Sequence, residues 1–190
     1  MRFGKALMEK LKELKYPRDH IFIERFADYP LPIEGCTPEE IEEIKTVQNL
    51  SGKKLPQVYI EFLLHLGKRS GDLLIGYDLN YRYLIGYNFT EACNEQLIAD
   101  GHHPLSDRYY VFMNKQTVIH WFFSIDEGDD PFVYEYCERS GDEETDEPYL
   151  GGPIKLDERL SDFLTDFIAQ RESKEAQSNF IQTYALEYRG

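Results

Sequence analysis

The stretch that decides the fold is Cys36-Thr37-Pro38-Glu39-Glu40-Ile41-Glu42-Glu43-Ile44, followed by Gly52-Lys53-Lys54-Leu55-Pro56-Gln57-Val58-Tyr59-Ile60-Glu61-Phe62-Leu63. It predicts two helices separated by a short break. Thr37 is a favourable N-cap, Pro38 suits the first helical position, and Glu40 stands where the partner residue of a capping box is found. The first helix therefore has a start that is defined by local sequence.

Both predicted helices have one apolar face. In the first, Ile41, Ile44 and Val47 are spaced to lie on the buried side. Pro56 opens the second helix, and Gly67 is suited to end it. The buried face of the second helix follows the spacing i, i+3, i+4, i+7 in Tyr59, Phe62, Leu63 and Leu66.

Further along the chain, three segments are typical of β-strands. Tyr109 to Met113 is rich in β-formers, whereas Thr117 to Ile125 and Phe132 to Cys137 alternate between two faces. A turn is expected at residues 114–116. The sequence thus predicts an α+β fold in which an antiparallel aromatic meander, at about residues 109–137, is flanked by helices.

The remaining segments are less regular. Residues 68–88 are expected to form loops with one or two short strands, and Ile154 to Leu156 a short edge element. We expect further helices at residues 3–15, at 90–100 with Thr90 as cap, and at 173–188. Asp157 is expected to cap another helix, whose apolar stripe consists of Leu160, Phe163, Leu164, Phe167 and Ile168. The chain then divides into an N-terminal helix and connector at 1–35, a domain at 36–171 and a C-terminal helix at 172–190.

Composition and charge narrow the range of possible partners. The 190 residues include 21 Lys and Arg against 35 Asp and Glu, a formal net charge of −14. Such a field repels nucleic acid and attracts a basic partner, although it also simply aids solubility. We expect a cytoplasmic protein, because the three cysteines are dispersed and the N-terminus does not resemble a signal peptide. The absence of a long apolar run predicts no membrane segment. We expect a monomer or a weak homodimer.

The ordered motifs resemble the SUKH superfamily of Smi/Knr-like proteins over roughly residues 36–170. The resemblance depends on Leu55-Pro56-x-x-Tyr59-x-x-Phe62-Leu63, on the glutamate-rich helix before it and on the late Phe163-Leu164. It implies an α+β domain that binds proteins without catalysis. Bacterial members look like immunity proteins that neutralise a cognate toxin, often a nuclease, and eukaryotic members look like regulators of cell-wall synthesis.

Charge suggests where a basic toxin would bind. Residues 126–147 contain eleven carboxylates against one base, Arg139. Steering by such a segment speeds association with a cationic surface, while the structural alternative is a solvated loop. The predicted partner-binding carboxylates are Asp126, Glu127, Asp129, Asp130, Glu143, Glu144, Asp146 and Glu147.

Tyrosines form the second candidate group. Tyr77, Tyr81, Tyr83 and Tyr87 lie in a glycine-containing region, where they suit interface anchors or a platform for a sugar. The first three are the predicted partner-binding tyrosines. The structural alternative is that they belong to the core. A carbohydrate-linked or cell-wall regulatory module is therefore the alternative function.

No motif predicts catalysis. Walker, GxSxG, HExxH and GxGxxG sequences are absent, and His102-His103 has no third ligand at a metal-binding spacing. A cluster of His120, Glu135 and Cys137 is conceivable across neighbouring strands, but nothing else in the sequence supports it. We therefore expect no enzyme activity, no cofactor and no metal site.

Overall fold

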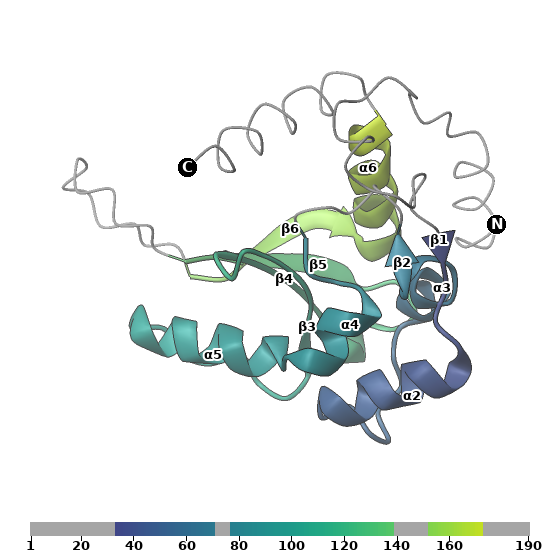
Figure 1. Ribbon diagram of the computed structural model, residues 1–190. Coiled ribbons are helices and arrows are strands. Elements are labelled where there is room, and N and C mark those ends of the chain that lie inside the picture. Colours follow the sequence, from purple (N-terminus) through teal and green to yellow (C-terminus); the bar gives the residue numbers. More distant parts are fainter. Residues whose placement is uncertain (1–32, 71–76, 139–151, 173–190) are drawn as a thin grey trace, which may run out of the picture.

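The computed structural model describes residues 33–70, 77–138 and 152–172 (Figure 1). The helices are α2 (Pro38–Val47), α3 (Gln57–Leu66), α4 (Tyr81–Gly86), α5 (Phe89–Ala99) and α6 (Leu160–Glu172). The strands are β1 (Ile33–Glu34), β2 (Arg69–Ser70), β3 (Tyr109–Lys115), β4 (Ile119–Ser124), β5 (Phe132–Cys137) and β6 (Ile154–Arg159). This confirms the α+β prediction, whereas the helices predicted at 3–15 and 173–188 lie outside the described residues.

Helix α2 starts as its sequence predicts. The Thr37 hydroxyl accepts a hydrogen bond from the Glu40 amide at 3.3 Å, and the Glu40 carboxylate accepts one from the Thr37 amide at 2.8 Å. This reciprocal pair is a complete capping box. Ile41 and Ile44 are buried, but Val47 is 36% exposed, so its predicted burial is wrong.

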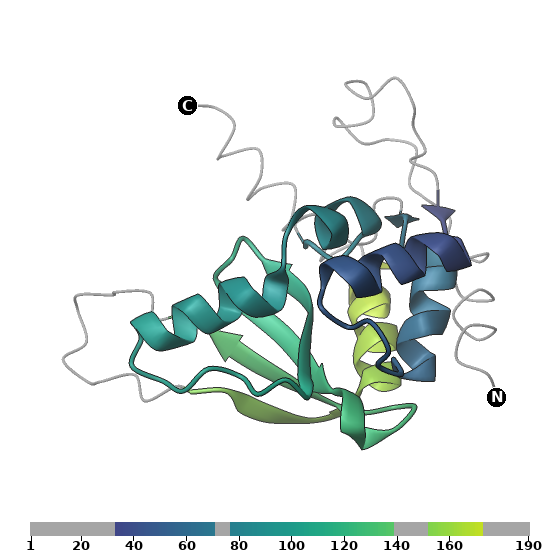
Figure 2. The same ribbon diagram turned by 90° about the horizontal axis from the view of Figure 1, so that it is seen from below.

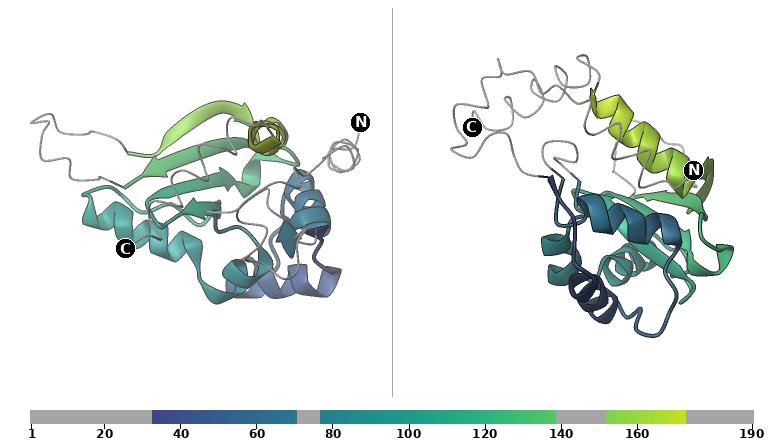
Figure 3. Two further views of the ribbon diagram at one scale, coloured as in Figure 1. Left: turned by 45° about the horizontal axis from the view of Figure 1, so that its top comes forward. Right: turned by 90° about the vertical axis from the view of Figure 1, so that its right-hand side faces the viewer.

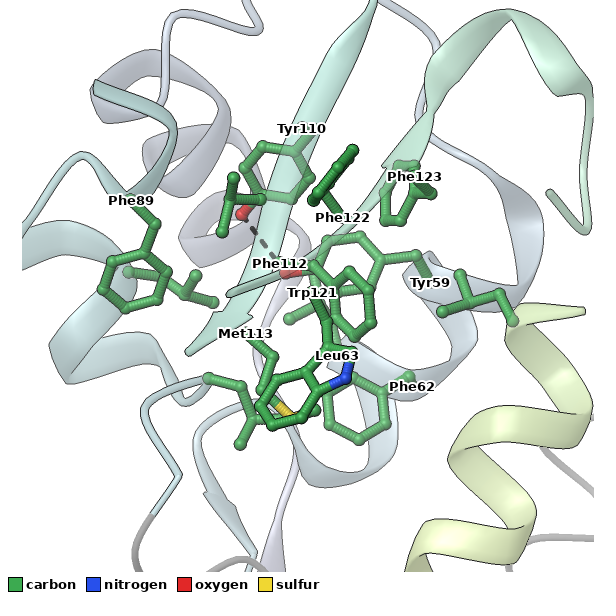
Figure 4. Packing of buried hydrophobic residues seen from close by; sticks show 14 of the residues in the cluster. Tyr59, Phe62, Leu63, Phe89, Tyr110, Phe112, Met113, Trp121, Phe122 and Phe123 are labelled. Carbon is green, nitrogen blue, oxygen red and sulfur yellow. Dashed lines mark hydrogen bonds between the residues drawn. The ribbon is translucent and has the colours of Figure 1, made fainter. Parts of the chain in front are cut away.

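Helix α3 packs against the sheet through its buried face. Its four predicted core residues, Tyr59, Phe62, Leu63 and Leu66, are all fully buried. The Tyr59 ring contacts Tyr110, Phe112 and Phe123 of the sheet, with ring centroids 5.4–6.0 Å apart (Figure 4). The Tyr59 and Tyr110 hydroxyls lie 3.2 Å apart, which satisfies both buried groups. Gly67 ends the helix in an ordinary right-handed conformation.

The meander is confirmed, and it has a fourth strand. The antiparallel order is β3-β4-β5-β6. The first turn lies later than predicted, because Gln116 and Thr117 adopt positive φ angles of 53° and 60°. Asparagine and glycine are the usual residues there, so the sequence at this turn gave little indication of it.

Helices cover both faces of the sheet. Helices α3 and α6 pack on one face (Figure 3). There, Phe163 of α6 contacts Phe112 and Trp121. Helix α5 crosses the other face and buries Cys93 and Leu97 against it (Figure 2). The apolar stripe predicted for α6 is confirmed, because Leu160, Phe163, Leu164 and Ile168 are buried and Phe167 is partly buried.

Two helix starts differ from the prediction. Helix α5 is capped by Asn88, whose side chain accepts from the Glu91 amide at 3.1 Å. Thr90 instead accepts a hydrogen bond from the Val111 amide and so links α5 to β3. Asp157 does not cap a helix, because β6 continues to Arg159 and α6 begins only at the next residue. Helix α4 was not predicted at all.

Candidate functional site

The acidic turn, defined as Asp126–Asp130 between β4 and β5, is a structural junction. Glu127 accepts hydrogen bonds from the Phe132 amide at 3.0 Å and the Tyr134 hydroxyl at 2.7 Å. Both bonds close the hairpin. Burial and the neighbouring Glu127 carboxylate raise the pKa of Tyr134, which keeps this phenol a donor.

The same turn holds the start of two helices. Asp130 accepts from the backbone amide of Ser161 at 3.0 Å and from its hydroxyl at 2.7 Å, and so caps α6. The backbone carbonyl of Asp129 accepts from the Val58 amide at 3.1 Å, in the first turn of α3. The carboxylates of Asp130 and Glu127 therefore already serve the fold.

Two carboxylates of the turn are exposed. Asp129 pairs with Lys54 at 2.8 Å, with both side chains well exposed, so this ion pair adds little stability. Asp126 is also exposed. These two side chains remain predictions for partner binding. The other predicted carboxylates, Glu143, Glu144, Asp146 and Glu147, lie outside the described residues.

The three predicted tyrosines differ in environment. Tyr77 is partly buried and packs edge-on against Phe167, with ring centroids 4.6 Å apart. The Tyr81 hydroxyl donates to Glu43, and this hydrogen bond raises the pKa of Tyr81 to about 12. Only Tyr83 is substantially open, at 36% exposure.

Tyr87 belongs to the same tyrosine group in the sequence but was not among the predicted partner-binding residues, and it is 66% exposed at the end of α4. It lies one helical turn from Tyr83. The buried side-chain amide of Gln48 donates to the backbone carbonyls of Leu84 and Tyr87, and it thereby fixes α4 against the end of α2. With Val47, these tyrosines form the α4 surface, defined as Val47, Tyr83 and Tyr87. The sequence did not predict that helix α4 brings Tyr83 and Tyr87 together.

The structure separates the two halves of the predicted site. The acidic turn contacts the start of α3, whereas α4 follows its end, where the Tyr81 amide donates to the Gly67 carbonyl at 2.6 Å. A helix of ten residues is roughly 15 Å long. The acidic turn and the α4 surface are therefore two distinct places on the molecule.

The conceivable cluster of His120, Glu135 and Cys137 does not form. Strand pairing aligns His120 with Tyr136, and Trp121 with Glu135. Alternation then places His120 on the face under α5 and the other two on the opposite face. Glu135 accepts instead from the Trp121 indole at 2.8 Å.

The described residues contain neither a group of side chains that could hold a metal ion nor a helix that could cross a membrane. In residues 33–70, 77–138 and 152–172, no three His, Cys, Asp or Glu side chains are grouped to hold a metal ion. No helix in that part of the chain is long and apolar enough to cross a membrane.

Comparison with known proteins identifies one family. The family model described as SMI1/KNR4 (SUKH-1) matches residues 35–169, from the end of β1 to within α6. Neither the curated proteins nor the solved structures gave a match.

Proposed function

The chain belongs to the SMI1/KNR4 (SUKH-1) family, and from this we propose that it is an immunity protein that binds and neutralises a cognate toxin. Family membership is the observation that carries the proposal, since it indicates binding to a protein partner. Neutralisation would be steric and electrostatic, with no catalysis by this chain. The net charge of −14 favours a basic toxin such as a nuclease.

Two surfaces suit such a partner. The α4 surface presents two exposed tyrosines on a helix that contacts α2, where Glu43 accepts from Tyr81, and tyrosine is enriched among residues that dominate binding energy. The acidic turn adds Asp126 and Asp129, which would steer a cationic surface. Steering and anchoring would then be separate tasks at the two ends of α3.

Co-expression tests the proposal. Cells would produce the toxin domain encoded beside this gene together with the wild-type protein, a variant with Asp126→Lys and Asp129→Lys, or a Glu95→Lys control. Glu95 is also exposed but lies on α5. We expect wild type and control to protect cells and the turn variant to protect less, with a lower association rate at low salt. Absence of protection by the wild type would refute the proposal.

The alternative, a regulatory or carbohydrate-linked module of cell-wall synthesis, stays a prediction. It relies on Tyr77, Tyr81 and Tyr83, of which the first two already contact other residues. Glycan binding that is lost in Tyr81→Ala and Tyr83→Ala variants would favour it over toxin neutralisation.

A further inference from the structure

The sheet face that α5 crosses has an uncovered aromatic part with cations around it. Tyr109, Phe132 and Tyr134 are only partly buried there. The rings of Tyr109 and Tyr134 contact each other and the intervening Phe122. Figure 2 shows that α5 crosses this face of the sheet. Around them are exposed cations, which with these rings we define as the cationic face: Arg108, Lys155 and Arg159. Such a grouping is unexpected in a chain with a charge of −14.

Phe132 fixes the spacing of two of these cations. The Lys155 ammonium lies 3.7 Å and the Arg159 guanidinium 3.8 Å from the centre of its ring. Both distances are near van der Waals contact with a ring face, so the two cations must lie on opposite faces. They are therefore about 7 Å apart. A bulge in the β5–β6 pairing produces this arrangement, because it sets Phe132 opposite Arg159 and Tyr134 opposite Lys155.

The cations of the cationic face have N–H groups that make no hydrogen bond within the described residues. Arg159 uses one N–H on the Asp130 carbonyl at 3.0 Å, and a guanidinium has five N–H groups. Within residues 33–70, 77–138 and 152–172, no carboxylate pairs with a cation of the cationic face. Carboxylates of that same part of the chain do pair with Lys45, Lys54, Lys68 and Arg69.

Strand β6 offers backbone groups beside these cations. Among the described strands it pairs with β5 alone, and five of its six residues are exposed. An unpaired strand edge accepts an extended peptide as an additional strand. Side chains at alternate positions of such a peptide lie on one side, about 7 Å apart. That spacing matches the distance between the two cations.

We propose that β6 and the cationic face bind an extended acidic segment of a partner protein, which adds as a strand and places carboxylates at alternate positions on Lys155 and Arg159. Asp157 and Glu158 on the same strand disfavour a segment with a carboxylate at every position. Nucleic acid fits less well, because cations already occupy both faces of Phe132 and the net charge repels a long polyanion. The proposal is independent of toxin neutralisation.

Fluorescence anisotropy with the full chain tests it. The probe is a labelled ten-residue peptide with glutamates alternating with threonines. One comparison peptide has glutamine in place of glutamate, and a second has the same composition with its glutamates consecutive. We expect saturable binding of the alternating peptide, at least tenfold tighter than the glutamine peptide and several-fold tighter than the consecutive one.

Variants locate the site. Lys155→Gln and Arg159→Gln should each weaken binding of the alternating peptide at least fivefold, Arg159→Lys less, and the exposed Arg82→Gln on α4 not at all. If Arg159→Gln unfolds the protein, the binding measured with Lys155→Gln alone tests whether the peptide binds at the cationic face. Equal binding by Lys155→Gln and wild type would overturn the proposal. Displacement of the peptide by a ten-nucleotide oligothymidylate would also overturn the proposal, because the site would then bind nucleic acid. Self-association of the protein that Lys155→Gln abolishes would overturn it too, because the site would then bind a second copy of the chain.

Discussion

At the scale of single residues, Gly35 shows how tightly the chain entry packs against α3. The Cys36 amide donates to the Leu63 carbonyl at 2.8 Å, and a Cβ on Gly35 would overlap the carbonyl oxygen of Leu64. We therefore expect Gly35→Ala to destabilise the protein by about 3 kcal/mol or more, as measured by urea unfolding. Gly86→Ala is the matched control. Nothing lies near a Cβ there, so its effect should stay within about 1 kcal/mol.

His120 makes stability depend on pH. It is 1% exposed, and neither ring nitrogen has a hydrogen-bond partner in the described part of the chain. Burial lowers the pKa of His120, with only a weaker opposing effect of the Thr117 backbone. The unfolded state then binds a proton more readily than the folded state. The contribution of neutral His120 to the free energy of unfolding is therefore complete above pH 6.5. It is lost as the pH falls towards the folded-state pKa of His120.

Urea unfolding of wild type and His120→Phe at pH 7.5 and pH 5.5 measures this contribution. Wild type should lose more stability on acidification than the variant, by up to about 1.4 kcal/mol per pH unit. Carboxylates titrate in both proteins and cancel in the comparison. Equal losses in the two proteins would contradict the prediction.

At the scale of elements, the cap of α6 is the sharpest test of the acidic turn. Asp130→Ala removes both bonds to Ser161 and should cost about 1–2 kcal/mol. Asp130→Asn keeps an acceptor and should cost less. Asp126→Ala, at an exposed position of the same turn, should change the free energy of unfolding by less than about 0.5 kcal/mol. A larger effect of Asp126→Ala than of Asp130→Ala would show that the cap is unimportant.

The elements also show what sequence could and could not predict. The start of α2 was predictable because Thr37 and Glu40 are three residues apart and interact with each other. The start of α6 was not, because its cap, Asp130, comes from a turn some thirty residues earlier. Helix α4 has six residues and depends on Gln48 from α2, which is a tertiary contact with no local pattern.

The candidate site was predictable only as charge and composition. Counting carboxylates indicated the acidic turn, but a count cannot distinguish Asp126, which is exposed, from Glu127, which holds the hairpin. Counting tyrosines likewise grouped Tyr77 with Tyr83, although only the latter is open. The separation of turn and tyrosines by the length of α3 follows from the fold alone.

At the scale of the whole molecule, substitutions on the α4 surface should weaken toxin binding while leaving the folding stability nearly unchanged. Tyr87 and Tyr83 are exposed, so Tyr83→Ala with Tyr87→Ala should change the free energy of unfolding by less than about 1 kcal/mol. If this surface anchors the toxin, the same change should weaken the complex at least tenfold, mainly through faster dissociation. Calorimetry and surface plasmon resonance measure both. Ile98→Ala, on the exposed side of α5, is the control for lost apolar area.

The acidic turn also forms hydrogen bonds with parts of the chain that are distant from each other in sequence. It accepts the Val58 amide through Asp129 and the Ser161 amide through Asp130. One opening of this turn would release both amides to solvent deuterium, whereas the Glu40 amide, bonded within its own capping box, would exchange independently. Asp130→Asn should then speed exchange at Val58 and Ser161 together and leave Glu40 unchanged. The two helices that cover one face of the sheet would thus loosen as a single unit.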